Sequence, residues 1–240
     1  MKRNALITWG GEEGHEPEKG AALFCKLLEA DGMAVEVVNT LSCFDDVEYL
    51  KTLDLIVPLW TMRTLTRERS ENVSEALAEG TGLAGCHGQM CDAFRDNVLW
   101  QFITGGNFVG HPHGDGQQYR VRITESEHEL VAGIEDFDVI SEQYYLHVDP
   151  AVHVLAVTTF PTRDWYHSPN GRVDMPVVWT KRWGLGRVYY NSLGHKVNVI
   201  DHGQPLEMLR RGLIWASHGR EAAMAAGENH LDLAAPGNHY

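Results

Sequence analysis

The segment Gly85-Cys86-His87-Gly88 sets two reactive side chains between small residues, directly after a short apolar run. Small neighbours are what a sharp strand-to-helix turn requires, because such a turn exposes its central side chain above the sheet. With Cys86 at the apex, the chain offers a thiol for nucleophilic catalysis with a histidine partner. With His87 at the apex, an imidazole points into the cleft for acid–base work or metal ligation. In a purely structural interpretation, Cys86 is a buried hydrophobe and His87 a hydrogen-bonding loop residue.

Apolar runs and amphipathic stretches alternate through the first half of the chain and would position this turn. A helix begins at Pro17 and a second follows Thr66, because Pro fits a first helical turn and Thr an N-cap. The expected strands are residues 4–9, 33–38, 54–60 and 82–86. Strand and helix in alternation predict an α/β fold with a parallel sheet covered on both faces.

The second half of the chain is less regular. Apolar spacing predicts helices at 92–103 and 205–216. Further strands are expected at residues 119–123, 152–158, 175–180 and 187–191. We expect one domain over residues 1–218. Residues 219–240, rich in Ala, Gly, His and Asn, are expected to be disordered or to form an arm over the body or over a partner subunit of a homo-oligomer.

Four predicted loops share one end of this sheet. In an open parallel sheet the ligand site lies beyond the carboxyl ends of the strands. The loops at that end are residues 9–15, 60–63, 86–89 and 192–195, and they carry Trp, His and Gly. Glycine-rich loops often do no more than turn the chain, but four such loops at one end favour a binding cleft.

Composition excludes several classes of protein. The 240 residues include 20 Lys and Arg against 33 Asp and Glu, a net charge of −13, and no basic stripe suited to nucleic acid. No apolar run approaches the ~18–20 residues of a membrane span. The four cysteines are few for this length and fit a reducing compartment. We therefore expect a cytoplasmic protein that binds neither nucleic acid nor membrane.

Six short motifs then occur in order between residues 3 and 216. They are Gly14-His15-Glu16 and residues 85–95, 104–112, 141–145, 175–179 and 186–195. In this combination the chain resembles the ThuA-like (trehalose-utilization) family of the class I glutamine-amidotransferase-like superfamily. The resemblance implies a flavodoxin-like three-layer sandwich with a mostly parallel central sheet. It also implies a role in sugar or disaccharide catabolism, on a trehalose-type or keto-sugar substrate.

The resemblance decides which residue occupies the apex of the turn. His87 falls at the position that a catalytic cysteine holds in true amidotransferases, and His195 falls where the partner histidine stands. The position of Cys86 is not a fixed cysteine among relatives, which argues against glutaminase activity. A Cys86 thiol hydrolase remains as a minor alternative.

His15, His87, Glu142 and His195 are thus candidates for one pocket. We assign catalytic roles to His87, Glu142 and His195. Imidazoles with a carboxylate suit zinc or a similar divalent metal, and His15, His87 and His195 would be its ligands. Without a metal, the same residues could move protons at a sugar carbon beside a carbonyl. The reaction would be that of an isomerase, a lyase or a hydrolase.

Sugar rings stack their C–H faces on aromatic rings, and their hydroxyls need polar partners. The predicted substrate-binding residues are Trp9, His15, Trp60, Asp92, His111 and Tyr144. A competing hypothesis is a non-catalytic carbohydrate-binding or interaction protein on an amidotransferase-like shell. Loss of His87 discriminates the two, because an enzyme would lose turnover whereas a binding protein would keep its affinity.

Overall fold

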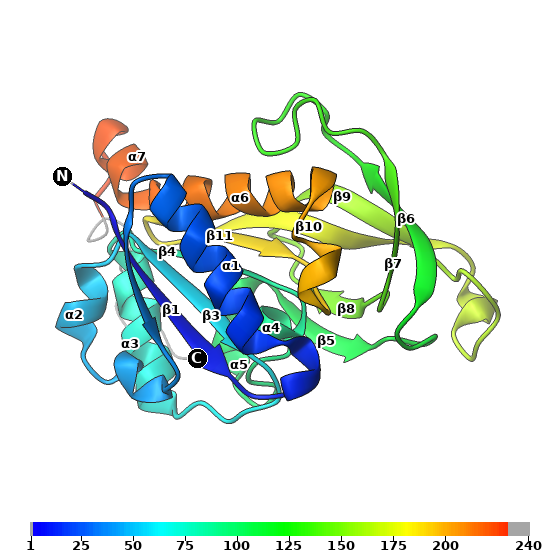
Figure 1. Ribbon diagram of the computed structural model, residues 1–240, viewed down its shortest axis with the longest axis horizontal. Coiled ribbons are helices and arrows are strands. Elements are labelled where there is room, and N and C mark those ends of the chain that lie inside the picture. The colour runs from blue at the N-terminus through cyan, green and yellow to red at the C-terminus, as the bar shows by residue number, and fades with distance from the viewer. Residues whose placement is uncertain (1, 230–240) are drawn as a thin grey trace.

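The computed structural model describes residues 2–229, and within them a nine-stranded sheet runs in the order β2-β1-β3-β4-β11-β10-β9-β6-β7 (Figure 1). A separate two-stranded sheet pairs β5 with β8. The strands are β1 (Asn4–Gly10), β2 (Ala34–Val38), β3 (Leu55–Trp60), β4 (Gly82–Cys86), β5 (Gly106–Gly110), β6 (Gln117–Ile123), β7 (Phe137–Ser141), β8 (Tyr145–Val148), β9 (His153–Phe160), β10 (Val173–Trp183) and β11 (Gly186–Asn191). The helices are α1 (Pro17–Ala30), α2 (Val47–Lys51), α3 (Arg67–Ala78), α4 (Gly88–Cys91), α5 (Val98–Thr104), α6 (Gly203–Ser217) and α7 (Gly219–Ala225), with 3-10 turns η1 (Glu13–His15), η2 (Leu41–Phe44), η3 (Ser168–Asn170) and η4 (Val197–Val199).

The sheet has a parallel half and an antiparallel half. Strands β2, β1, β3, β4 and β11 pair in parallel, and β10, β9, β6 and β7 extend the sheet with antiparallel pairings. The predicted α/β class and helix-covered central sheet are confirmed. The parallel strands β3 and β4 are buried along nearly their whole length, as expected for strands covered on both faces.

Two hydrophobic clusters cover the two faces of the sheet. Successive residues of β1 alternate between them: Ala5 and Ile7 join the cluster under α1 and α6, whereas Leu6 joins the cluster under α2, α3 and α5. This alternation follows from the two-residue period of a strand. Figure 1 shows α1 and α6 side by side on the near face of the sheet. The result is a three-layer sandwich.

The predicted helix over residues 92–103 is wrong at its start. Helix α4 ends at Cys91, and α5 begins only at Val98, where the Asn97 side chain caps the N–H of Trp100 at 2.9 Å. Between them, the carbonyl oxygens of Asp92 and Ala93 accept hydrogen bonds from the next loop along the sheet, residues 62–63. Because these carbonyl groups bond to another loop, they do not form the hydrogen bonds of a helical turn. Asp92 therefore lies in a loop at the carboxyl end of the sheet.

The chain after residue 218 continues as α7. Arg220 of α7 donates to the carbonyl oxygen of Lys51, and Arg182 of β10 pairs with Glu228. Residues 230–240, the second half of the expected arm, lie outside the described residues, and the domain boundary at residue 218 stays a prediction. Within residues 2–229, no helix is both long and apolar enough to cross a membrane.

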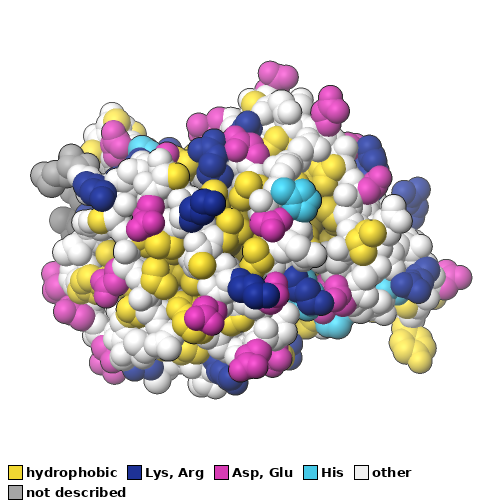
Figure 2. Space-filling model, viewed as in Figure 1, with side chains coloured by type: hydrophobic (Ala, Val, Ile, Leu, Met, Phe, Trp, Pro, Cys, Tyr) yellow, Lys and Arg dark blue, Asp and Glu magenta, His cyan; other side chains and the backbone are white. Residues whose placement is uncertain are grey.

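The face shown in Figure 2 carries acidic and basic side chains interspersed among hydrophobic ones. Charges of the two signs are mixed there rather than separated into large fields. Neither sign dominates this face, although the net charge of the whole chain is −13.

Candidate active site

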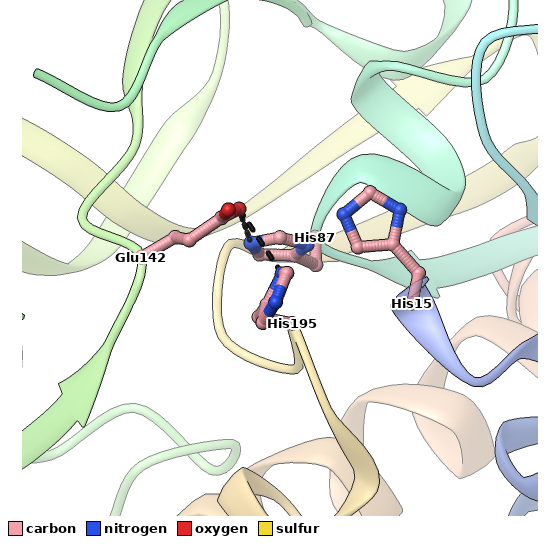
Figure 3. A group of neighbouring side chains, drawn as sticks. All are labelled: His15, His87, Glu142 and His195. Carbon is pink, nitrogen blue, oxygen red and sulfur yellow. Dashed lines mark ion pairs between the residues drawn. The ribbon is translucent and has the colours of Figure 1, made fainter. Parts of the chain in front are cut away.

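Four side chains from distant parts of the sequence meet at the carboxyl end of the parallel strands (Figure 3). They are His15 of η1, His87 between β4 and α4, Glu142 after β7, and His195 in the loop after β11. One potential ligand atom from each lies within 4.8 Å of all the others. The three imidazole rings have centroids 5.0–5.4 Å apart. The structure therefore brings together all four residues that the sequence singles out.

His87 lies at the centre of this group and is fully buried. The backbone N–H of His87 donates to the carbonyl oxygen of Asn191 at 2.7 Å. This bond joins the turn after β4 to the end of β11. Its ring packs against Tyr144 with centroids 3.9 Å apart. Burial, and then the nearby imidazoles of His15 and His195, hold the pKa of His87 well below its ordinary value. The ring is therefore neutral at physiological pH.

The backbone is strained at this site. Among residues 2–229, the non-glycine residues with positive φ are Glu16, Met62 and His87, with φ of 50°, 52° and 50°. His87 is a member of the cluster, Glu16 follows His15, and Met62 lies in the pocket wall. Such conformations cost about 1–3 kcal/mol each and concentrate where function requires them. Their joint location marks these loops as the functional end of the sheet.

Glu142 is the carboxylate of the cluster. Its Oε2 lies 3.1 Å from Nδ1 of His195 and 3.5 Å from Nε2 of His87, and its Oε1 lies 3.6 Å from Nε2 of His111. Burial acts to raise the pKa of Glu142, but the neighbouring imidazoles, His195 first, bring it below its ordinary value. The group is therefore a carboxylate at neutral pH. Tyr119 fixes its backbone by donating to the Glu142 carbonyl oxygen at 3.1 Å.

His15 is positioned by polar groups behind the cluster. Its Nδ1 lies 3.0 Å from the hydroxyl of Thr61, and its carbonyl oxygen accepts from the Gln89 side chain at 2.7 Å. A bond at Nδ1 fixes the ring and leaves Nε2 to face the other ligand atoms. Burial, followed by the neighbouring His195, lowers the pKa of His15 to about 4.

The lowered pKa of His15 makes stability depend on pH. Between pH 6.5 and 4 the unfolded chain binds a proton at His15 that the folded, metal-free protein does not, so stability rises with pH across this window. We expect the metal-free protein to lose about 3 kcal/mol between pH 7 and pH 4 from this residue. Urea unfolding at both pH values measures the loss. His15→Gln should show a shallower dependence, and an unchanged slope in that variant would contradict the assignment.

The donor set fits a divalent metal ion. Both ring nitrogens of His87, Oε2 of Glu142 and Nδ1 of His195 are buried and make no well-aligned hydrogen bond within the described part of the chain, although Oε2 lies within ion-pair distance of the His87 and His195 rings. Buried polar atoms without a partner are costly, and a shared cation would satisfy several at once. With metal–ligand bonds of ~2.1 Å, the donors around a tetrahedral zinc ion lie about 3.4 Å from one another. The four donor atoms lie within 4.8 Å of one another, so the side chains would have to approach by up to about 1.4 Å to close on such an ion.

A cavity of about 250 Å³ opens beside the cluster. Its lining residues are Glu12, Gly14, His15, Met62, Asp92, Arg95, Phe108, His111, Glu142, Tyr144 and His195. Asp92 is buried and paired with Arg95, whose guanidinium lies 5.1 Å from the centre of the Phe108 ring. Burial raises the pKa of Asp92 despite this pairing. Of the predicted substrate-binding residues, His15, Asp92, His111 and Tyr144 thus line one pocket.

Trp9 and Trp60 do not line this pocket. Trp60 turns across β1, where its Nε1 donates to the Thr8 hydroxyl at 2.9 Å and its ring fills the space beside Gly10. Trp9 packs against the hydrophobic cluster under α1 and α6. A position at the end of a strand places a residue near the cleft but does not determine the direction of its side chain. We therefore assign no sugar contact to Trp9 or Trp60.

Comparison with known proteins decides the family. The model of the family described as "ThuA: Trehalose utilisation" matches residues 4–216. The chain belongs to the ThuA family. The resemblance inferred from the six motifs is therefore confirmed. No curated protein matches the chain.

Several solved structures share the fold, and two of the three compared below are described as thua-like proteins. A thua-like protein from Bacteroides uniformis superposes with a TM-score of 0.72 at 21% identity, covering 89% of this chain and 91% of that one. A second, from Parabacteroides merdae, has a TM-score of 0.69 at 17% identity, covering 92% and 91%. A cytoplasmic protein from Salmonella typhimurium LT2 has a TM-score of 0.62 at 14% identity, covering 91% and 98%.

The residues of this ThuA site that the sequence analysis did not name individually include Thr61, which positions His15, and Phe108, which lines the pocket. Thr61 follows β3 as His87 follows β4, so the rule that selected His87 would have selected it too. Phe108 lies on β5, a short strand outside the main sheet whose sequence does not alternate between polar and apolar residues. Only its inclusion in the motif over residues 104–112 pointed to this segment.

Proposed function

We propose that this ThuA protein is an enzyme that acts on a sugar or an oxidised, keto form of a sugar. Membership of a family described by trehalose utilisation supports the carbohydrate class. The reaction is an isomerisation, an elimination or a hydrolysis. We further propose that the protein acts in the cytoplasm, in line with a fold neighbour described as a cytoplasmic protein.

One observation carries the proposal: three histidines and a carboxylate meet in a buried cluster beside a cavity, and several of their polar atoms make no well-aligned hydrogen bond within the described residues. A binding protein gains nothing from orphaned imidazole nitrogens, whose burial costs free energy. Perturbed titratable groups in a cleft are typical of catalytic sites. We therefore assign the chemistry to His87, Glu142 and His195.

A divalent cation such as zinc would be held by His15, His87, Glu142 and His195. When bound, it would polarise a carbonyl or hydroxyl oxygen of the substrate. Such ligation needs neutral imidazoles, and the lowered pKa values of His15 and His87 keep both rings neutral. The ionised Glu142 adds the negative charge that a cation needs.

The chain's own groups would bind and orient the sugar around this centre. Without a metal, Glu142 and His195, 3.1 Å apart, would instead form a carboxylate–imidazole pair that can accept a proton from a sugar carbon or hydroxyl. Asp92, Arg95 and His111 offer hydrogen bonds to the hydroxyls of a ring in the cavity. Phe108 and Tyr144 also line the cavity and offer aromatic surface on which the C–H face of a sugar can pack.

Metal analysis of protein purified without chelators or immobilised metal, combined with a screen of disaccharides and their keto forms, tests the proposal. We expect about one equivalent of a divalent metal and turnover of at least one keto-sugar. Protein free of metal that binds a sugar without converting it would instead support the non-catalytic carbohydrate-binding alternative.

The thiol hydrolase alternative predicts a reactive Cys86. Burial raises the pKa of Cys86 to about 12, and its Sγ donates to Oε1 of Gln89 at 3.6 Å. We expect Cys86→Ser to keep at least half of the parent turnover in the sugar assay. Iodoacetamide should leave Cys86 unlabelled in the folded protein at pH 7.5, as peptide mass spectrometry would show. Loss of activity in the Ser variant with an intact fold would favour the thiol enzyme.

A further inference from the structure

A second cavity, of about 310 Å³, lies between α6, the start of β11 and the segment that joins β6 to β7. Its lining residues are Glu129, Leu130, Arg187, Arg210, Arg211, Ile214, Trp215 and His218. It shares no lining residue with the catalytic pocket. Arg187 is the second residue of β11, whereas His195 follows the other end of that strand, so the two cavities lie at opposite ends of the sheet.

Arg187 is the central cation of this cavity. Its guanidinium lies 4.7 Å from the centre of the Trp215 ring, and Nη1 donates to the Trp215 carbonyl oxygen at 3.2 Å. Among residues 2–229, no carboxylate approaches its nitrogens within ion-pair distance, although Glu129 is near enough to act on it through space. Burial lowers the pKa of Arg187, because the charged guanidinium has lost contact with solvent and has no counter-ion within ion-pair distance among the described residues. An anion in the cavity would offset that cost.

The charged side chains that line the cavity are mostly positive. Arg210 and Arg211 share one carboxylate, Glu207, at 2.7–2.9 Å. Arg211 is further fixed by its donation to the carbonyl oxygen of Ala132 at 2.8 Å. Three guanidinium groups therefore line the cavity with one lining carboxylate, Glu129, in a chain whose net charge is −13; Glu207 pairs with two of the three, and Asp31 acts on Arg210 through space.

The shape of the donors indicates which anion fits. Guanidinium groups are planar forks that bind tetrahedral or planar oxyanions through two parallel hydrogen bonds. Ile214 and Trp215 give the same cavity an apolar wall, which suits a ligand with a body attached to its charged group. A phosphate ester of a small polar molecule meets both requirements, and free phosphate meets the first.

We propose that this cavity is a binding site for a phosphate group, free or carried by a small organic ester such as a sugar phosphate. Arg187 binds the phosphate oxygens, Arg210 and Arg211 add to the positive potential, and Trp215 borders the rest of the ligand. The site is distinct from the catalytic cluster and does not depend on the function proposed for it.

Calorimetric titration with inorganic phosphate and with glucose 6-phosphate, in chloride buffer at constant ionic strength, tests the site. We expect saturable binding of one equivalent and at least a tenfold loss of affinity in Arg187→Met. Arg67→Met is the matched control, because the Arg67 side chain is 80% exposed on α3, where it pairs with Glu71, and it does not line the cavity; the affinity of this variant should equal that of the parent. A tighter complex with glucose 6-phosphate identifies an ester as the ligand class, and equal affinities identify free phosphate.

Two further variants keep the result decisive. Arg210→Met leaves Arg187 in place and should weaken binding at least threefold even if Arg187→Met fails to fold. Glu142→Gln alters only the catalytic cluster and should bind phosphate like the parent. The proposal is overturned if neither compound gives saturable heat, if Arg67→Met weakens binding as much as the cavity variants do, or if Glu142→Gln abolishes binding, which would locate the phosphate in the catalytic pocket.

Discussion

Replacing His87 with glycine is expected to abolish turnover while the protein remains folded. The imidazole is the central member of the cluster, and the loss of an acid–base group alone costs about 10²–10⁴-fold in rate. We expect turnover in the sugar assay to fall about 10³-fold or more, together with the metal content of the purified protein. Steady-state kinetics and metal analysis measure the two losses.

His87→Ala is the matched control, because it removes the same ring but keeps a β-carbon. His87 has φ of 50° and ψ of −148°, a region that glycine visits far more readily than any other residue. We therefore expect metal-free His87→Gly to be more stable than His87→Ala by about 1–3 kcal/mol in urea unfolding. Equal stabilities would show that the backbone is not strained, and full activity in either variant would remove His87 from the mechanism.

Glu142→Gln should weaken the binding of zinc at least 100-fold. The substitution preserves the shape of the side chain but removes the one carboxylate of the four-residue cluster. Even a residue that only orients a metal ligand contributes about 10–100-fold to affinity, so a direct ligand should contribute more. Competition with a chromogenic chelator measures the affinity.

His111→Gln provides the comparison for Glu142→Gln. His111 lies 3.6 Å from the opposite oxygen of Glu142, is partly exposed, and is not one of the four clustered donors. Since His111 can do no more than orient Glu142, we expect its loss to weaken zinc binding about tenfold, well below the effect of Glu142→Gln. If Glu142→Gln binds zinc as the parent does, Glu142 is a proton acceptor only, and the metal site proposed for it is wrong.

The parallel half of the fold was predictable because its signals are local. Residues 54–60 form a continuous apolar run, and the Thr66 hydroxyl caps the N–H of Arg69 as an N-cap should. The antiparallel half was harder to predict. Strand β7 and the small β5–β8 sheet are short and partly exposed, and their pairing depends on contacts between segments about 20–40 residues apart in sequence, which no periodicity reveals.

The candidate site was predictable as a set of residues but not as a geometry. His15, His87 and His195 each follow an element that ends at the same edge of the sheet, so a general rule for parallel sheets selects them. Glu142 follows an antiparallel strand, and only the family resemblance selected it. The orientation of Trp60 depends on its packing beside Gly10, and that of Trp9 on its packing against the hydrophobic cluster under α1 and α6; a one-dimensional pattern encodes neither.

The order of strands in the sheet has a consequence for synthesis of the protein. Strand β4, which ends at Cys86, pairs on one side with β3 and on the other with β11, which ends at Asn191. At about 5–20 residues per second, a ribosome takes roughly 5–20 s to add the intervening chain. Throughout that interval one edge of the nascent β4 has no partner strand. Its unpaired backbone groups can then pair with a strand of another chain, which leads to aggregation. Ribosome-associated chaperones have their most useful target on this protein during that interval, before β11 inserts.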